Sequence, residues 1–181
     1  MPNLVAPSIK YKRSFLEAAA EYQKEYKETG NQRLERYAKL NLDKLNDSGE
    51  FENFVNKLKA QAKGEGLPEG YVPSSVFWLV DGEEFIGQVD IRHRLTPLLK
   101  ETGGHIGYDI RPSKRKQGYG KLILKLALEK AKELGIKDAL VTCDVTNTVS
   151  KKVIEANGGK LESQLKGAVG KPDKLRYWIH T

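Results

Sequence analysis

The sequence predicts an α+β domain: a mixed, mainly antiparallel sheet with helices on both faces, one parallel β-α-β crossover and an N-terminal helical region. Three observations support this class. Residues 11–63 show apolar spacings typical of helices, and short strand-like runs follow from Ser75 onward. One long amphipathic helix separates two of these strand-like runs. We treat residues 1–181 as a single domain, with a helical region at 1–74 and a core at 75–181.

Composition places the chain among ordinary globular proteins. Hydrophobic residues make up 39% and charged residues 30%, and no apolar run reaches the length of a membrane span. The start of the chain has no basic segment followed by an apolar one, so no export signal is expected. The single cysteine, Cys143, excludes an internal disulfide. These features favour a reducing cytoplasmic location.

The net charge of +7 has two possible explanations. One is affinity for nucleic acid or another acidic partner, and the other is attraction of a small ligand with several negative charges. The cations gather around one loop, which favours the small ligand over a solvated basic surface; they are Arg111, Lys114, Arg115, Lys116, Lys121 and Lys125.

The N-terminal region is expected to hold three helical segments. In the first, at 11–28, Ser14 and Glu17 have the spacing of a capping box, and Gly30 ends the helix. A shorter helix is expected within 31–47 and an amphipathic one at 50–63. Residues 64–75 are rich in glycine and proline and are expected to form a loop.

The first strands are expected at 76–80 and 85–92, joined by a turn at Asp81-Gly82. Alternation places Gln88, Asp90 and Arg92 on one face of the second strand. These polar side chains would be buried in a covered sheet unless they line a cleft. A connection at 95–103 leads to the central strand, His105 to Pro112.

A helix from Gly118 to Leu134 follows, with Gly135 as its C-cap. The strand at 139–144 is expected to run parallel to the central strand, because a helix joins them through a right-handed crossover. Thr146 or Asn147 caps a second helix that ends near Ala156. An antiparallel pair at 160–164 and 175–179 closes the domain.

The loop before the long helix has the features of an anion-binding device. A strand feeds a glycine-containing loop at a helix N-terminus, where free N–H groups and the helix dipole favour negative charge. It is not a Walker A loop, since Leu122 follows Gly120-Lys121 where serine or threonine is required. It is not a dinucleotide fingerprint either, because Ile123 replaces the third small residue.

The pattern Arg-x-x-Gly-x-Gly, Arg115 to Gly120, preceded by a strand and Pro112, resembles the acetyl-CoA loop of the GNAT superfamily of N-acetyltransferases. The resemblance covers about residues 75–181 and implies that acetyl-CoA is the acetyl donor. It implies that the loop holds the pyrophosphate, that the central strand backbone binds the pantetheine, and that the start of the second helix also contacts CoA. The cofactor residues implied in this way are Asp109, Ile110, Arg115, Lys116, Gln117, Gly118, Tyr119, Gly120, Lys121, Asn147 and Ser150. Asn147 and Ser150 are equally suited to simple helix capping.

The sequence departs from the family pattern at Ile154, where many members carry a tyrosine as the general acid. Tyr108 or Tyr177 could take that role. Candidate general bases are Asp90, His93, Glu101 and His105, with an internal Asp90–Arg92 ion pair and a surface histidine as the alternatives. The catalytic candidates are therefore Asp90, His105 and Tyr108, and no metal site is expected.

The resemblance implies an enzyme that transfers acetyl to an amine by direct attack in a ternary complex, with residues 11–63 forming part of the acceptor wall. The amine could belong to a small molecule, an amino acid or a protein. Two alternatives remain: a CoA-binding regulator without turnover, and a basic module that binds nucleic acid or an acidic partner. We expect no membrane or nucleic-acid partner, and either a monomer or a homodimer.

Overall fold

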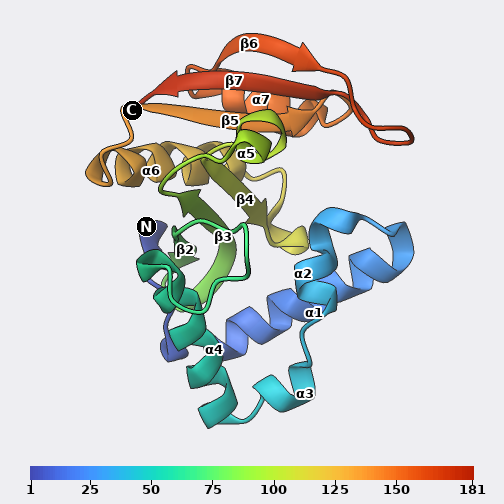
Figure 1. Cartoon of the computed structure of the whole chain (residues 1–181). Coiled ribbons are helices and arrows are strands. Elements are labelled where there is room, and N and C mark those ends of the chain that lie inside the picture. The colour runs from blue at the N-terminus through green and yellow to red at the C-terminus, as the bar shows by residue number, and fades with distance from the viewer.

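The structure, a computed structural model, describes all 181 residues and contains two antiparallel sheets (Figure 1). The first has the strand order β1-β2-β3-β4, and the second has the order β5-β7-β6. The strands of the first sheet are β1 (Asn3–Val5), β2 (Ser74–Asp81), β3 (Glu84–Arg92) and β4 (Ile106–Ile110). Those of the second are β5 (Asp138–Asp144), β6 (Lys160–Leu165) and β7 (Lys174–His180).

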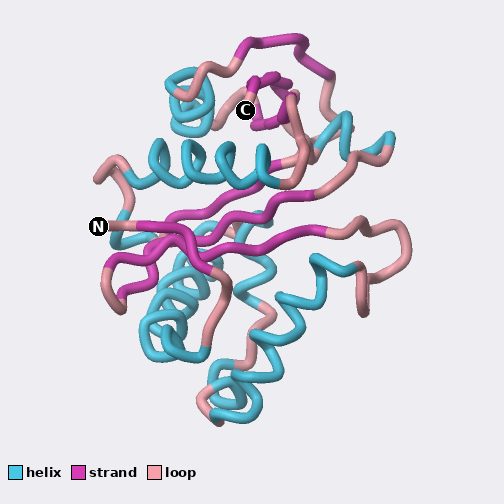
Figure 2. The backbone as a smooth tube through the Cα atoms, turned by 90° about the vertical axis from the view of Figure 1, so that its left-hand side faces the viewer, coloured by secondary structure: helices cyan, strands magenta, loops and turns pink.

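Helices cover both faces of the first sheet, as Figure 2 shows. One face is covered by the N-terminal helices and 3-10 turns: η1 (Ile9–Tyr11), α1 (Lys12–Thr29), η2 (Gln32–Leu34), α2 (Glu35–Ala38), α3 (Leu42–Leu45), α4 (Ser48–Ala60) and η3 (Gln61–Lys63). The opposite face is covered by α6 (Tyr119–Glu133). The remaining elements are α5 (Pro97–Thr102), η4 (Pro112–Lys114) and α7 (Thr148–Ala156).

Strand alternation divides the apolar side chains between two cores. On the N-terminal face, Phe15 of α1 stacks on Trp78 of β2, with ring centroids 4.9 Å apart. On the other face, Val89 and Ile91 of β3 pack with Ile123 of α6 and with strands of the second sheet. The alternation predicted for β3 is therefore present, and it leaves the polar side chains of that strand on the N-terminal face.

The α+β class is confirmed, but the central sheet is divided, and the expected parallel pairing of the strand at 139–144 (β5) with β4 does not form a ladder. The backbones of the two sheets are joined only by an isolated bridge between Gly104 and Val141 and by a 2.7 Å hydrogen bond from the His105 amide to the Leu140 carbonyl. Beyond this junction, β4 and β5 are neighbours without a ladder of hydrogen bonds. The outer backbone edge of β4 is consequently open toward β5.

The helix starts show how tertiary contacts override local patterns. Ser14 lies inside α1 rather than at its N-cap, and its hydroxyl accepts a 2.9 Å hydrogen bond from the Phe85 amide. The expected capping box is therefore wrong. Two short elements, β1 and α5, were not expected. None of the helices is both long and apolar enough to cross a membrane.

Candidate active site

The loop between β4 and α6 has a backbone suited to holding an anion. Gly118 is the N-cap of α6 with φ +85°, and Lys116 also has a positive φ of 61°. Nothing lies within 4 Å of the position that a Cβ on Gly118 would occupy. The N–H groups of residues 116–120 donate to no protein acceptor. Five amides are thus free at the positive end of a helix.

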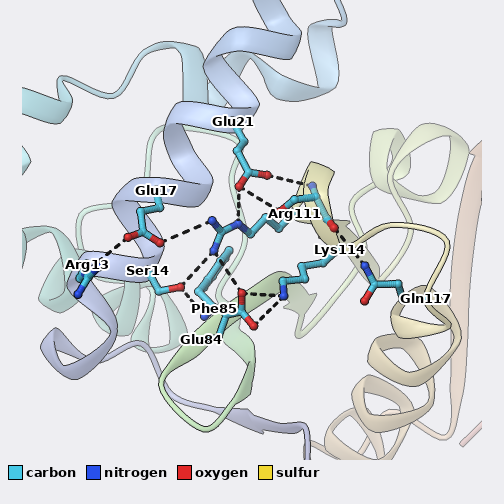
Figure 3. A network of polar contacts seen from close by, with 10 residues as sticks. Arg13, Ser14, Glu17, Glu21, Glu84, Phe85, Arg111, Lys114 and Gln117 are labelled. Carbon is cyan, nitrogen blue, oxygen red and sulfur yellow. Dashed lines mark hydrogen bonds and ion pairs between the residues drawn. The ribbon is translucent and has the colours of Figure 1, made fainter.

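The basic cluster predicted around this loop is only partly free. Arg111 is buried among acidic residues, with its Nε 2.7 Å from an Oε of Glu21 (Figure 3). Lys114 forms a 2.7 Å ion pair with Glu84. These two side chains therefore hold α1 and the β2–β3 hairpin to the loop, and they do not face a ligand. Lys116, Lys121 and Lys125 take part in none of the ion pairs.

Arg115 also acts within the protein. Its Nε donates to the Ile110 carbonyl over 3.1 Å, and its guanidinium pairs with Glu25 at 2.8 Å. The side chain therefore ties the loop to both the end of β4 and helix α1. This agrees with the expectation that Arg115 positions the loop, while its charge is largely offset by Glu25.

The open edge of β4 is presented by Tyr108 and Ile110. The Arg92 amide donates to the His105 carbonyl and the Arg111 amide donates to the Ile86 carbonyl, so odd-numbered residues of β4 turn their backbone toward β3. The backbone of Asp109 is therefore committed to β3. The expectation that its backbone is free for a ligand is corrected, and the backbone groups of Tyr108 and Ile110 are the ones that face away from β3.

Tyr108 and the start of α7 meet on the α6 side of β4. The Tyr108 hydroxyl lies 3.2 Å from the Ser150 Oγ. Asn147 caps α7 by accepting a 3.0 Å hydrogen bond from the Ser150 amide, so the capping role of Asn147 is realised. Burial raises the pKa of Tyr108 to about 12, although the Ser150 contact opposes this. The phenol therefore keeps its proton at neutral pH.

The structure does not support His105 as a general base. Its Nδ1 accepts a 2.9 Å hydrogen bond from the Leu140 amide, which connects β4 to β5. Burial and the nearby Arg92 guanidinium lower the pKa of His105, so the ring is neutral. The lone pair that a base needs is already used. His93 is also hydrogen-bonded, with Nε2 2.8 Å from the Ser75 Oγ.

A cavity of about 650 Å³ opens on the N-terminal face of the first sheet. Gln88, Asp90 and Arg92 line it, so the polar face of β3 borders a cleft as the alternation suggested. Arg92 Nη1 donates to the carbonyls of Gly103 and Gly104, and no ion pair forms between Asp90 and Arg92. The Oδ1 atom of Asp90 is buried without a hydrogen-bond partner.

Gly107 of β4 lies opposite Asp90 in the sheet register. It belongs to the same face as Asp90, and a Cβ there would come no closer than 3.9 Å to any side chain, the nearest being Arg92. The absence of a side chain at this position leaves space between the cavity and the β4 edge. The cavity and the open strand edge are thus neighbours.

Two arginines near the start of α2 connect the N-terminal region to both sheets. Arg36 forms an ion pair with Asp109 of β4, and the Tyr37 hydroxyl lies 3.5 Å from the same carboxylate. Arg33 forms an ion pair with Asp144 at the end of β5, which also pairs with Lys174. Both neighbouring strands are therefore held by one short segment.

The chain thus combines two separate sheets, an open strand edge between them and a loop with free amides at a helix N-terminus. The model of the acetyltransferase (GNAT) domain matches residues 16–160, and the chain belongs to this family of acetyltransferases. The match includes most of the N-terminal helices, which the resemblance in the sequence did not reach. No curated protein sequence matches the chain significantly.

Solved structures share the fold at low identity. RimJ from Mycobacterium smegmatis, in complex with a CoA disulfide, has a TM-score of 0.68 and 18% identity over 99% of this chain and 82% of its own. RimL, a ribosomal-protein alpha-N-acetyltransferase in complex with coenzyme A, has a TM-score of 0.66 and 17% identity over 99% of this chain and 93% of its own. A spermidine N-acetyltransferase chimera from Vibrio cholerae and hSSAT has a TM-score of 0.59 and 16% identity over 99% of this chain and 95% of its own.

Sequence reasoning missed three features of this site. The salt-bridge partners of Arg111 and Arg115 lie in α1, about 90 positions earlier in the chain. The open passage at Gly107 depends on strand register. The cavity depends on the loop at 64–73, whose residues line one wall without any sequence motif. Only the Gln88, Asp90 and Arg92 alternation pointed toward it.

Proposed function

We propose that this chain transfers an acetyl group from acetyl-CoA to a primary amine by direct attack in a ternary complex. The observation that carries the proposal is the set of five unpartnered amides at residues 116–120, beside the open edge of β4. An unsatisfied set of N–H groups at a helix N-terminus suits a phosphate or pyrophosphate. Family membership supports acetyl-CoA as its source.

The residues around the loop fit such a donor. Lys116, Lys121 and Lys125 are exposed, take part in no ion pair, and can add charge to the amides. Gly118 leaves the approach open. The β4 edge at Tyr108 and Ile110 offers backbone groups to a pantetheine amide, although the Ile110 carbonyl already accepts from Arg115. A donor bound in this way extends from the loop toward Gly107.

The acceptor amine would approach from the cavity on the opposite face. Asp90 is the acidic side chain that lines this cavity, and it takes part in none of the ion pairs. An alkyl ammonium group has a pKa of about 10.4, so the nucleophile must lose a proton before it attacks. In this proposal, the Asp90 carboxylate accepts that proton.

The nitrogen bonds to the thioester carbonyl carbon and loses one further proton to solvent, and the carbon–sulfur bond breaks. Tyr108, protonated because of its raised pKa, donates its proton to the departing sulfur and regains one from solvent. A thiol of pKa about 8.5 leaves readily, so this donation contributes modestly. Tyr177 is a weaker candidate, because its ring is buried in the core on the α6 side and its hydroxyl donates to Glu155 over 3.2 Å.

Calorimetric titration with acetyl-CoA tests donor binding. Gly118→Asp puts a carboxylate among the free amides and should reduce affinity by at least about tenfold. Gly135→Asp is the matched control, because Gly135 has a similar φ of +80° and equally open surroundings at the other end of α6. Equal affinity for acetyl-CoA in the two variants would contradict the pyrophosphate assignment.

Thiol release from acetyl-CoA across a panel of amines then tests turnover. Binding without amine-dependent thiol release would favour the regulator. A nucleic-acid module would instead show strongly salt-dependent RNA or DNA binding and no acetyl-CoA binding. The ion pairs of Arg111, Lys114 and Arg115 leave that alternative with few free cations at the loop.

A further inference from the structure

The cavity that contains Asp90 has walls from three parts of the chain. Helices α1, α2 and α4 form one wall, the loop before β2 forms the second, and α5 with the residue before it forms the third. Of the 21 lining residues, 11 are hydrophobic, so the wall offers a large apolar surface to a ligand. Four aromatic side chains contribute to it: Phe15, Tyr37, Phe54 and Tyr71.

The charges in the cavity are few, and most are already paired. Arg36 is neutralised by Asp109, and Arg92 donates to two backbone carbonyls. Asp90 is the only acidic residue among the lining side chains, and it is half-buried and takes part in none of the ion pairs. The cavity can therefore hold one cation at Asp90 and has no second acidic side chain for another.

We infer that the acceptor is a primary amine on an apolar body that carries no second positive charge. The inference rests on the proposed acetyltransferase function and names its substrate class. The ammonium group pairs with Asp90, and the apolar body lies against the aromatic and aliphatic walls. A second ammonium would lie either in that apolar wall or near Arg36 and Arg92, and both positions are unfavourable.

The volume suits a body of modest size. A cavity of about 650 Å³ lies within the usual range of roughly 300–1,000 Å³ for small-ligand pockets. An arylalkylamine has this shape, and so does the N-terminal residue of a peptide that begins with an apolar side chain. Both sources share the same chemistry: one amine, attached directly to apolar surface.

The decisive experiment compares n-pentylamine with cadaverine, which has the same carbon chain and a second amine. With saturating acetyl-CoA, thiol release should show a kcat/KM at least about tenfold higher for n-pentylamine. Phenylethylamine should equal or exceed n-pentylamine, because its ring adds apolar contact. Equal or faster turnover of cadaverine or spermidine would overturn the inference.

A second readout is independent of turnover. Calorimetric binding of n-pentylamine to the protein saturated with coenzyme A should weaken at least about tenfold in Asp90→Asn. Glu83→Gln is the control: Glu83 belongs to the same hairpin, is exposed and forms no ion pair. Unchanged binding in Asp90→Asn would contradict the role given to Asp90.

The two sources of amine are separated by a peptide that begins with phenylalanine. Faster thiol release with this peptide than with phenylethylamine identifies a peptide acceptor, and the reverse identifies a small molecule; either result supports the shared chemistry. Failure of the proposed function itself has a different signature. In that case acetyl-CoA does not bind, or no amine of any charge releases thiol.

Discussion

The hydroxyl groups of Tyr108 and Ser150 lie 3.2 Å apart, although 42 residues separate them in the sequence. Tyr108 belongs to β4 and Ser150 to α7, so this contact spans the region where the two sheets have no ladder between them. It places an un-ionised phenol at the open strand edge. The contact offers an explanation of how an acid can be supplied when Ile154 stands at the family's usual tyrosine position.

Tyr108→Phe should lower kcat for amine acetylation by about 10- to 100-fold and leave the affinity for acetyl-CoA nearly unchanged. The hydroxyl is lost while the ring and its packing remain. Because burial raises the pKa of Tyr108 to about 12, its ionisation should cause no loss of activity below about pH 11. Steady-state thiol release measures both effects.

Tyr177→Phe is the matched control for that variant. Burial also raises the pKa of Tyr177 to about 12, but its hydroxyl donates a hydrogen bond to Glu155, away from the open edge of β4. If kcat falls equally in Tyr177→Phe and Tyr108→Phe, the position of Tyr108 at the strand edge does not explain its effect on turnover.

His105→Phe should destabilise the fold by about 1–3 kcal/mol, because the Leu140 amide loses its acceptor where the two sheets meet. The pKa of His105 is lowered by burial and by Arg92, so the unfolded chain binds a proton more readily than the folded one. The free energy of unfolding should therefore decrease as the pH falls below the ordinary value of 6.5. Urea denaturation at several pH values measures this.

His105→Phe should also remove the contribution of His105 to the pH dependence of the unfolding free energy. The shape of the pH–rate profile of acetylation should stay the same. His180→Phe serves as control, since His180 is exposed and pairs with Asp138. A pH–rate limb that disappears in His105→Phe would restore the histidine as a general base.

Arg111→Gln should lower the free energy of unfolding by about 1–3 kcal/mol, because it removes the buried guanidinium that pairs with Glu21 of α1 (Figure 3). Arg13→Gln should have no measurable effect, although Arg13 pairs with the same Glu17 that Arg111 approaches, since Arg13 is exposed. Equal stability of the two variants in urea would contradict the anchoring role of Arg111.

Glu21→Gln should reduce the loss of stability in acid. Burial alone would raise the pKa of Glu21, but the Ser113 amide and Arg111 outweigh it, and the net shift is downward. A lowered pKa stabilises the folded state above the ordinary value of 4.5, and this stabilisation is lost as the pH falls through the lowered value. Denaturation curves recorded across this acid range should converge for Glu21→Gln and the parent protein.

Gly107→Val should abolish most amine acetylation while leaving acetyl-CoA affinity within about threefold of the parent. The side chain would fill the space between Asp90 and the strand edge, yet valine suits a strand and meets only the Arg92 guanidinium at close range. Parallel calorimetry and thiol release separate the two effects. Full activity in this variant would contradict the proposed path of the acceptor.

The sequence predicted the parts of the site that follow from local pattern. Arg115 to Gly120 form a loop before a helix, and Asn147 caps α7, because turn and cap chemistry act over a few residues. The α+β class and the family followed from the same stretch. Gln88, Asp90 and Arg92 share a face because alternation in a strand is also local.

The remainder depends on contacts between distant segments. Ser14 has the spacing of a cap, yet its hydroxyl is used by the Phe85 amide, 71 positions away. His105 has the chemistry of a base, but its Nδ1 is occupied by β5. Asp109 lies on the expected strand, and only the register with β3 determines that its backbone faces inward. Residue type and spacing cannot report such partners.

The ion pairs of Arg33 with Asp144 and of Arg36 with Asp109 have an evolutionary consequence. The same short segment that borders the acceptor cavity also anchors the two strands beside the donor site. A substitution there that adapts the enzyme to a new amine would also change the distance between β4 and β5, where the thioester is proposed to bind. Divergence of acceptor preference should therefore proceed more easily through the loop at 64–73 and through α5, which border the cavity but form no ion pair with either strand.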